Sequence, residues 1–326
     1  MKKALITGVY GQDGSYLSEI LHNENYEIYG ICREQLSESS KHNKIELERE
    51  GIHIKECCVS LHDYDAVGEM IKEIQPDVAF HLAAIHHSSS SSENNSILAE
   101  KLLYDLNILA TGNLLANCYE HSPYTRVVTA GSCLMYDDSK EVIQDEQTKY
   151  SSKSMYGLAK IAEKNLVNYY RKKGFFACVS ILYNHESHRR PPQFVTKKIA
   201  NGMKAISRGE LETLELGDIN VKKDWGFAGD YAMAMKLMSE AEAPKDYIIS
   251  SGELHTIEEY IELCAKELGI NDWRSRVVIN QELVTRKISA TLCGNSQKCI
   301  SELGWKRTMN FHDLVKEMLR DEEVKE

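Results

Sequence analysis

The chain has 326 residues, of which 42% are hydrophobic and 27% are charged, and its formal net charge is −10. This composition is typical of a soluble globular protein, and the length allows one large α/β unit or a nucleotide domain with a smaller cap. The negative charge without a dominant basic stripe argues against a nucleic-acid partner, and no apolar run is long enough to cross a membrane.

Cysteine usage and the start of the chain indicate the cellular compartment. The nine cysteines include no C-x-x-C pair, so they form neither a zinc site nor an even set of disulfides. The Met-Lys-Lys start leads directly into a predicted strand rather than into a signal sequence. We therefore expect a reduced, cytoplasmic protein.

The first elements are a strand, a glycine turn and a helix. Ala4-Leu5-Ile6 is a short apolar run, and residues 15–24 carry apolar side chains at helical spacing. Between them lie the turn residues Gly8, Tyr10, Gly11, Gln12, Asp13 and Gly14. In such a turn the first glycine bends the chain, the second lets backbone approach a pyrophosphate, and the third lets helix and strand pack closely. We therefore predict a dinucleotide-binding site here.

The residues after the second predicted strand, 27–32, should select the cofactor. At this position an acidic side chain binds a ribose 2′-hydroxyl, whereas an arginine suits a 2′-phosphate. The sequence supplies both, Arg33 and Glu34. Because Glu34 would repel a 2′-phosphate, we favour NAD over NADP without excluding NADP; the alternative is that Glu34 only solvates the loop.

Strands and helices continue to alternate through the next hundred residues. We predict strands over 54–59, 78–84 and 126–130 and helices over 65–74 and 100–119. The 78–84 strand ends in Leu82, Ala83 and Ala84, whose small size would let backbone pass close to a nicotinamide ribose. His81, His86 and His87 lack acidic or cysteine partners at matching spacing, so no metal site is expected. The alternation predicts a parallel, doubly wound sheet.

A catalytic signal follows the 126–130 strand. Ser132 lies at the carboxyl end of that strand, where open α/β sheets bind ligands. Tyr156 and Lys160 lie four residues apart near the start of a helix that extends to Arg171, so they share one face. A lysine ammonium beside a phenol lowers the phenol pKa and lets the phenolate act as a base, while the Ser132 hydroxyl can bond the same substrate oxygen.

A family resemblance runs almost from end to end of the chain. It is carried by residues 7–17 (TGVYGQDGSYL), 182–190 (LYNHESHRR), 194–199 (FVTKKI), 216–218 (LGD), 222–226 (KKDWG) and 302–306 (ELGWK). Through these segments the chain resembles the extended short-chain dehydrogenases/reductases and, more narrowly, the GDP-mannose 4,6-dehydratases. The resemblance implies a Rossmann-type sheet with a smaller C-terminal cap that binds a nucleotide sugar.

The resemblance also implies site residues. Ser60 and Leu61 would lie at the adenine of the cofactor, and Cys133 and Leu134 would line the sugar pocket beside Ser132. The remaining substrate contacts would come from the second half of the chain: Asn184 at the hexose or its phosphates, Val195, Lys198 and Leu216 at the nucleotide, and Lys223 and Arg286 near the diphosphate. A sugar diphosphate needs such cations, although either lysine could instead be an ordinary solvated side chain.

One departure from the family changes the expected reaction. Where the dehydratases read Thr-Ser-Glu-Leu-Tyr, this chain reads Ser132-Cys133-Leu134-Met135-Tyr136. Leu134 therefore replaces the glutamate that removes the C5 proton and helps expel the C6 hydroxyl. The family's paired arginines become Arg33-Glu34, which supports NAD, and its adenine-contacting aspartate becomes Ser60.

We divide the chain into a nucleotide-binding domain over 1–180 and a part that is mostly substrate-binding cap over 181–326, interleaved with the first. Helices expected over 194–207, 231–240 and 257–268 suit that cap. The charged tail after Leu319 is expected to fray.

The sequence thus predicts a nucleotide-sugar oxidoreductase that oxidises or reduces C4 of a GDP-hexose or GDP-heptose through a 4-keto sugar, which would suit a polysaccharide pathway. The first alternative is a true 4,6-dehydratase whose acid/base is displaced to Cys133 or His185. The second is an epimerase, and the non-enzyme alternative is a silent nucleotide-binding scaffold. As a family expectation, the protein forms a homodimer or homotetramer.

Overall fold

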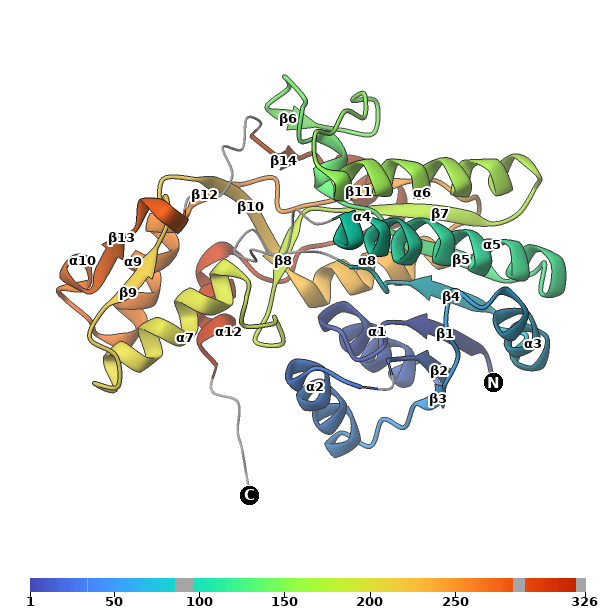
Figure 1. The fold of residues 1–326 in the computed structure, drawn as a ribbon, viewed down its shortest axis with the longest axis horizontal. Helices are drawn as coiled ribbons and strands as arrows, with labels where there is room; N and C mark the ends of the chain where they lie inside the picture. The colour runs from blue at the N-terminus through green and yellow to red at the C-terminus, as the bar shows by residue number, and fades with distance from the viewer. Residues whose placement is uncertain (34, 86–96, 284–290, 321–326) are drawn as a thin grey trace.

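The computed structural model describes residues 1–33, 35–85, 97–283 and 291–320. A seven-stranded sheet forms its centre, with the strand order β3-β2-β1-β4-β5-β7-β11 and parallel pairing throughout (Figure 1). Its strands are β1 (Lys3–Thr7), β2 (Glu27–Ile31), β3 (Lys55–Cys57), β4 (Val78–His81), β5 (Arg126–Ala130), β7 (Ala177–Leu182) and β11 (Tyr247–Ile249).

The inner strands of this sheet are covered on both faces. All six residues of β7 and all four of β4 are buried, as expected for parallel strands between two helical layers. The strand order reverses direction between β1 and β4, so their carboxyl ends open a crevice of the kind in which doubly wound sheets bind ligands. The predicted fold class is confirmed, and the predicted bounds of β5 are those of the structure.

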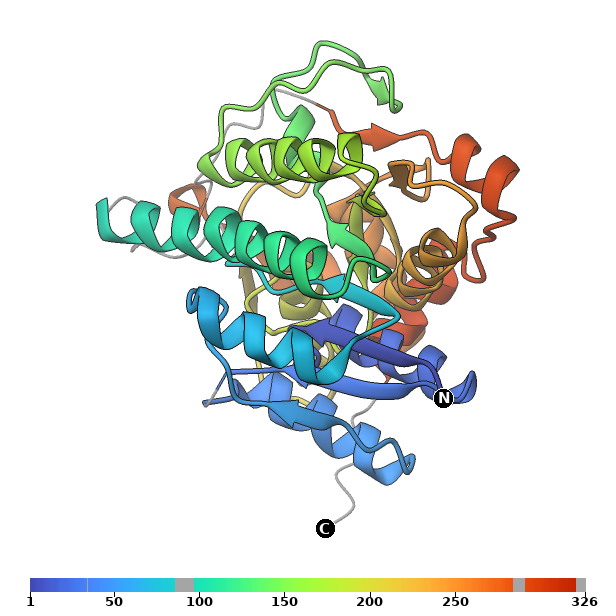
Figure 2. The ribbon, with the colours of Figure 1, turned by 90° about the vertical axis from the view of Figure 1, so that its right-hand side faces the viewer.

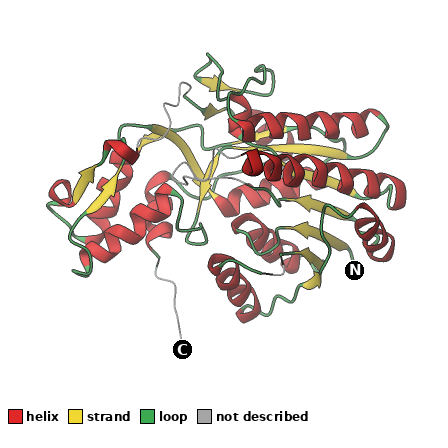
Figure 3. Ribbon diagram, in the orientation of Figure 1, coloured by secondary structure: helices red, strands yellow, loops and turns green. Residues whose placement is uncertain are grey.

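Helices form a layer on each side of the sheet (Figures 2 and 3). One layer holds α3, α5 and α6, which pack against one another, and the other holds α1 between α2 and α8. The bounds are α1 (Gln12–Asn23), α2 (Glu38–Arg49), α3 (Tyr64–Ile74), α4 (Ile97–Tyr104), η2 (Asp105–Leu109), α5 (Ala110–His121), η3 (Cys133–Tyr136), α6 (Met155–Lys172), α8 (Ala228–Glu240) and α11 (Gln297–Leu303).

A smaller unit lies at the left of Figure 1 and has its own hydrophobic core. Its helices α7, α9 and α12 pack together beside a two-stranded sheet of β9 and β13. Its elements are α7 (Val195–Ser207), β9 (Leu214–Leu216), α9 (Ile257–Leu268), α10 (Trp273–Arg276), β13 (Val277–Ile279), η4 (Gln281–Leu283) and α12 (Phe311–Leu319). Thr256 caps α9 with a full capping box, which explains why the helix begins where its sequence pattern predicts.

Short strands connect the two units. A three-stranded sheet has the order β12-β10-β8, and a two-stranded sheet pairs β14 with β6. Their bounds are β6 (Ile143–Gln144), β8 (Asn184–Glu186), β10 (Lys222–Phe227), β12 (Leu254–Thr256) and β14 (Cys293–Gly294). None of the described helices is both long and apolar enough to cross a membrane.

The strand predicted over 54–59 extends only over β3, Lys55–Cys57. Two expected helices differ more. The helix predicted over 231–240 as part of the cap is α8, which packs against α1 and joins the core of the large sheet through side chains such as Tyr231 and Met235. The long helix predicted over 100–119 is interrupted by the π-helical turn η2, in which the Asn107 side chain bonds both backbone groups of Ile85. Both differences arise from tertiary contacts that local patterns do not contain.

Candidate functional site

The glycine turn between β1 and α1 has the close packing that the sequence predicts. Gly8 has a φ of +72°, which only glycine adopts without strain. A Cβ on Gly14 would lie 2.5 Å from the Gly8 carbonyl oxygen, so a side chain there would separate the helix from the strand. Gly11 occupies the N-cap of α1 with no side-chain cap. The bare helix start can therefore receive a pyrophosphate, so these residues fit a dinucleotide.

Thr7 ties the end of β1 to the end of β4. Its hydroxyl oxygen accepts hydrogen bonds from the backbone N–H groups of Leu82, at 3.1 Å, and Ala83, at 3.0 Å. The same hydroxyl is 2.9 Å from Nδ1 of His81, so it donates its proton there. These bonds end β4 at His81, three residues before the predicted end, and leave Leu82, Ala83 and Ala84 as partly exposed backbone beside the glycine turn.

The candidate catalytic residues meet where η3 packs against the start of α6. Ser132 caps η3, and its hydroxyl accepts a hydrogen bond from the Leu134 N–H at 3.2 Å. The Leu134 carbonyl lies so close to Gly157 that a Cβ there would be 2.2 Å away. Since Gly157 directly follows Tyr156, this contact fixes the Ser132 segment beside the phenol.

Lys160 lies one helical turn beyond Tyr156. Its ammonium nitrogen is 5.6 Å from the Tyr156 ring centroid and 3.0 Å from Oε2 of Glu163. Burial raises the pKa of the Tyr156 phenol, and the Lys160 charge opposes that rise. Burial alone would lower the pKa of Lys160, but Glu163 and the Tyr156 phenol outweigh it and raise that pKa. Lys160 therefore stays protonated, as a base-activating lysine must.

His81 lies under the same group and stays neutral. Burial and the nearby Lys160 charge lower its pKa to about 3. Its Nδ1 accepts from Thr7, so it joins the carboxyl ends of β1 and β4. His86 and His87 lie outside the described residues.

Gln12 and Asp13 of the glycine turn connect the large unit to β8. Asp13 accepts a hydrogen bond from Nε2 of His185 at 2.9 Å, and the other ring nitrogen of His185 donates to the Tyr183 carbonyl at 2.7 Å. Burial alone would lower the His185 pKa, but the Asp13 carboxylate outweighs it and raises that pKa. The Gln12 side chain is also used here, because its amide nitrogen donates to the His185 carbonyl.

Neither substitute acid/base considered from the sequence is available in this arrangement. Both nitrogens of His185 donate hydrogen bonds, and its ring stacks on Tyr231 with centroids 4.7 Å apart. Cys133 is buried, and that burial raises the pKa of its thiol to about 12. A group that abstracts a proton near neutral pH needs a pKa close to that pH, so Cys133 is poorly suited, and His185 has no nitrogen that can accept a proton while both of these bonds are made.

The predicted nucleotide contacts gather between α7 and β9. Lys198, exposed on α7, donates from Nζ to the Glu215 carbonyl at 2.9 Å, which places it next to Leu216. Val195 lies one turn earlier and is 39% exposed. Asn184 and Lys223 lie on the neighbouring strands β8 and β10, and the Asn184 amide donates to the Asp224 carbonyl.

The predicted adenosine contacts are described only in part. Glu34 lies outside the described residues, while Arg33 and Ser60 are exposed and Leu61 is buried. Arg286, predicted near the substrate diphosphate, also lies outside the described residues. The side chain of Tyr10 is buried and its hydroxyl donates to Glu56, so its predicted contact with the cofactor would have to come from its backbone. Lys44 pairs with the same Glu56 carboxylate at 2.6 Å, so this cluster braces the turn from the side of α2 and β3.

Three residues near the site were not identified from the sequence. Asn107 holds Ile85 and so fixes the segment after β4. Glu163 pairs with Lys160, and a carboxylate on the apolar side of an amphipathic helix is the signal that could have revealed it. Arg190 lies close enough to influence the pKa of Tyr156 as well as those of Asp13 and His185, and although it ends the 182–190 segment of the family resemblance, no role was assigned to it.

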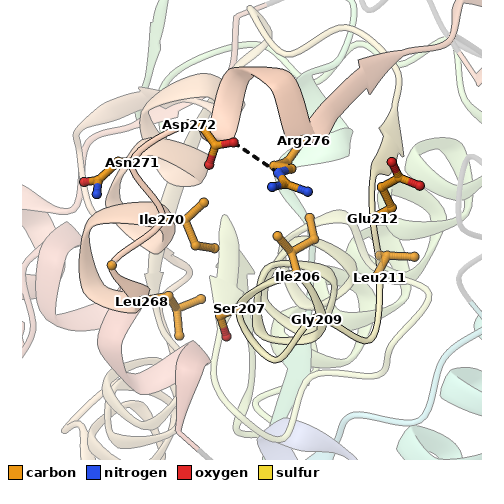
Figure 4. A pocket seen from close by; sticks show the side chains of 11 residues that line it. Ile206, Ser207, Gly209, Leu211, Glu212, Leu268, Ile270, Asn271, Asp272 and Arg276 are labelled. Atoms are coloured by element: carbon orange, nitrogen blue, oxygen red, sulfur yellow. Dashed lines mark hydrogen bonds and ion pairs between the residues drawn. The ribbon is translucent and has the colours of Figure 1, made fainter.

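A cavity of about 670 Å³ lies at the far end of α7 from Val195 and Lys198 (Figure 4). Apolar side chains such as Ile206 and Leu268 form its floor, and Asp272 and Arg276 pair at its edge at 3.3 Å. Because α7 is about 20 Å long, this hollow is separate from the crevice that holds Tyr156.

Comparisons with known proteins find one family along most of the chain. A family model described as GDP-mannose 4,6 dehydratase matches residues 5–318. GDP-mannose 4,6 dehydratase 2 of Arabidopsis thaliana is 35% identical over 99% of this chain and 87% of its own. GDP-mannose 4,6-dehydratase of Yersinia enterocolitica is 32% identical over 98% of this chain and 93% of its own.

Solved structures share the fold at lower identity. The dTDP-glucose 4,6-dehydratase from Bacillus anthracis, determined with NAD, has a TM-score of 0.80 at 19% identity and covers 98% of this chain and 96% of its own. The UDP-glucose 4-epimerase from Thermus thermophilus, also a complex with NAD, has a TM-score of 0.78 at 21% identity and covers 97% of both chains.

Proposed function

The chain belongs to the GDP-mannose 4,6-dehydratase family, and we propose that it is a nucleotide-sugar oxidoreductase that acts at C4 of a GDP-hexose or GDP-heptose without eliminating water. One observation carries this proposal. The resemblance implies an acid/base glutamate at the position of Leu134, and Leu134 is held beside Tyr156 by the contact between its carbonyl and Gly157. A leucine side chain cannot exchange a proton.

The residues that remain suit hydride chemistry. The Tyr156 phenolate accepts the proton of the sugar C4 hydroxyl, Lys160 stabilises that phenolate, and Ser132 donates a hydrogen bond to the C4 oxygen. Nicotinamide, when bound, supplies the acceptor or donor of the C4 hydride. The C4 hydroxyl becomes a ketone in one direction, and the ketone becomes a hydroxyl in the other.

The cofactor is NAD in this proposal. Gly8, Gly11 and Gly14 would hold its pyrophosphate at the start of α1, and Lys160 and the backbone of Ala83 would hold the nicotinamide ribose. The preference over NADP rests on Glu34, whose carboxylate would repel a 2′-phosphate. The cluster of Tyr10, Glu56 and Lys44 is compatible with this preference, because the Glu56 carboxylate neutralises the Lys44 ammonium that could otherwise attract a 2′-phosphate.

The nucleotide sugar would lie between α7, β8, β9 and β10. Lys198 and Lys223 supply cations for its diphosphate, Asn184 supplies an amide, and Val195 and Leu216 supply apolar contacts for the nucleotide. The names of the curated relatives support a GDP-linked sugar.

The second candidate function is GDP-sugar 4,6-dehydration. The match to the family over residues 5–318 favours it, and Leu134 opposes it. The two functions differ in their products, so the purified protein is incubated with GDP-mannose or GDP-manno-heptose in the presence of NAD. We expect reduced nicotinamide to accumulate and the sugar to lose two hydrogens in mass spectrometry.

A matched variant makes this test sharper. In Leu134→Glu, the restored carboxylate should divert the 4-keto sugar into loss of one water. Loss of one water by the unaltered protein, with no net change in nicotinamide, would replace our proposal by the dehydratase. If neither nicotinamide nor sugar changes with any GDP-sugar, the silent scaffold is the better description.

We also propose that the protein is a homodimer or homotetramer. Apolar side chains are exposed on α4, η2 and α6, which pack together on one layer: Leu102, Tyr104, Leu109, Leu158 and Tyr169. A second copy of this face is the simplest partner for such a surface. Light scattering should give a mass of two or four chains, and Leu109→Glu combined with Leu158→Glu should reduce it to one chain.

A further inference from the structure

Three ionisable side chains form a row on the buried face of α6. Tyr156, Lys160 and Glu163 are spaced by four and then three residues, so each lies above the next along the helix. The side chains of Lys160 and Glu163 are only 2% and 3% exposed, and their charged groups are 3.0 Å apart. The reacting phenol is at the crevice end of the row and the carboxylate is at the inner end.

The carboxylate needs an explanation, because burying it has a cost. An ion pair inside a protein contributes little net stability compared with apolar side chains of similar size, since both charges lose their water. A lysine that serves only to stabilise a phenolate needs no buried partner on its other side. Glu163 is therefore better explained by what it does to Lys160 than by the stability of the fold.

We propose that Glu163 is a positioning residue that holds Lys160 in place and keeps the proton on the lysine rather than on the phenol. This inference rests on the proposed function, in which the Tyr156 phenolate is the base. The pair of Tyr156 and Lys160 shares its protons. When the pair has lost one proton, it is either phenolate with ammonium, which is active, or phenol with neutral amine, which is inactive.

Glu163 selects between these two forms through distance. Its carboxylate touches the lysine nitrogen but is a further helical turn away from the phenol, so it stabilises the ammonium more than it destabilises the phenolate. The Glu163 carboxylate also stabilises the fully protonated pair of Tyr156 and Lys160, so this pair loses its first proton at higher pH. Removing the carboxylate should therefore lower the first apparent pKa and at the same time depopulate the active form.

Groups on the other elements packed against the row do not replace this effect. His81 on β4 is neutral at physiological pH. Burial raises the pKa of Glu163 itself, and the Lys160 charge and the Thr111 hydroxyl on α5 oppose that rise and favour the carboxylate. Cys133 on η3 remains a thiol because burial raises its pKa to about 12. Arg190, after β8, is the other charge that influences Tyr156, and it acts in the same direction as Lys160.

The test compares the pH dependence of kcat/KM for C4 oxidation in the unaltered protein and in Glu163→Gln, which keeps the side-chain shape without the charge. We expect the acid limb of the profile to move down by about one pH unit. The maximum rate should fall about tenfold, because a pKa shift of one unit corresponds to about a tenfold smaller population of the active phenolate–ammonium form. In Glu163→Asp, which keeps the charge, the acid limb should remain in place.

A matched control removes another buried carboxylate from a lysine of α6. Asp246 pairs with Lys164 at 3.0 Å, and both side chains are about one-tenth exposed. Asp246→Asn should weaken the fold without moving the pH profile. If Glu163→Gln lowers the rate but leaves the acid limb unmoved, as a merely structural residue would, our proposal is wrong.

A second measurement separates this inference from the proposed function. The ultraviolet absorbance of tyrosinate is titrated in the protein and in Tyr156→Phe, and the difference reports Tyr156 alone without any turnover. If no GDP-sugar reacts, the proposed function fails, but the Tyr156 titration should still change in Glu163→Gln. An unchanged titration would overturn the role of Glu163 even in an active enzyme.

Discussion

Gly14→Ala tests whether close packing of α1 against β1 forms the candidate cofactor site. The new Cβ would lie 2.5 Å from the Gly8 carbonyl oxygen and 2.6 Å from that of Val9. Ordinary carbon contacts are about 3.5 Å or longer, and both clashing atoms belong to the backbone, so the helix must move by roughly 1 Å. Overpacking of this kind costs about 3 kcal/mol, which lowers the folding equilibrium by more than about a hundredfold.

Gly112 serves as a control, because its replacement by alanine should raise the free energy of unfolding rather than lower it. A Cβ on Gly112, inside α5, would meet only the Leu166 side chain at 3.8 Å, which is an ordinary contact. Gly112→Ala should therefore stabilise the protein by up to about 1 kcal/mol, the usual helix preference of alanine over glycine. An intermediate case is Gly11→Ala, whose Cβ would lie 3.1 Å from the Gly8 carbonyl.

Urea unfolding measures the free energy of unfolding of the three variants, and calorimetric titration measures their affinity for NAD. We expect Gly14→Ala to lose about 3 kcal/mol and to bind NAD at least about tenfold more weakly, because the displaced helix start no longer faces the pyrophosphate. If Gly14→Ala matched Gly112→Ala in both measurements, the packing argument for this site would be refuted.

Other predictions concern the base, an ion network and thiol reactivity. Tyr156→Phe should reduce turnover about a hundredfold or more with NAD affinity retained, which single-turnover kinetics with calorimetry checks; an unchanged rate would remove Tyr156 from the chemistry. His188 is buried between Glu46 and Glu317 of α12. Burial alone would lower the His188 pKa, but these two carboxylates raise it above 6.5. The contribution of protonated His188 to the free energy of unfolding should be complete below pH 6.5 and be lost as pH rises through the raised pKa. The Tm difference between the protein and His188→Gln should therefore shrink on the alkaline side. Toward acid, the Glu46 contribution should be lost between its ordinary pKa of 4.5 and its lowered value of about 2. Alkylation at mildly alkaline pH, followed by peptide mass spectrometry, should modify the exposed Cys58 well before the buried Cys133; the reverse order would contradict the burial of η3.

Local sequence patterns predicted the bounds of elements whose boundary signals lie within the element or next to it. The strand over 126–130 and the helix over 257–268 have the predicted bounds, because β-branched residues between two helical layers and a capping box are both visible in sequence. The strand predicted to end at Ala84 ends at His81, since the next two N–H groups bond to Thr7 rather than to a neighbouring strand. That bond joins residues far apart in the chain, and no local pattern encodes it.

The candidate site shows the same limit. The spacing of Tyr156 and Lys160 is visible because both lie on one helix, and Glu163 was overlooked only because a single carboxylate on that face resembles surface charge. The partners of His185 could not be predicted in this way. Asp13 comes from the glycine turn and His185 from β8, so their ion pair exists only after the two units have folded together.

This ion pair also bears on the choice between the two candidate reactions. Elimination needs a carboxylate or similar group that gains and loses a proton in every cycle. Two carboxylates of the described crevice are already paired: Glu163 with Lys160 and Asp13 with His185. Burial nevertheless raises the pKa of Glu163 and also that of Asp224, whose charge influences Cys133. Burial alone would raise the pKa of Asp13, but the pairing with His185 lowers that pKa. A carboxyl group with a lowered pKa is a poor proton carrier near neutral pH. Together with Leu134, the pairing of Asp13 supports our proposal that proton exchange centres on Tyr156 and the sugar C4.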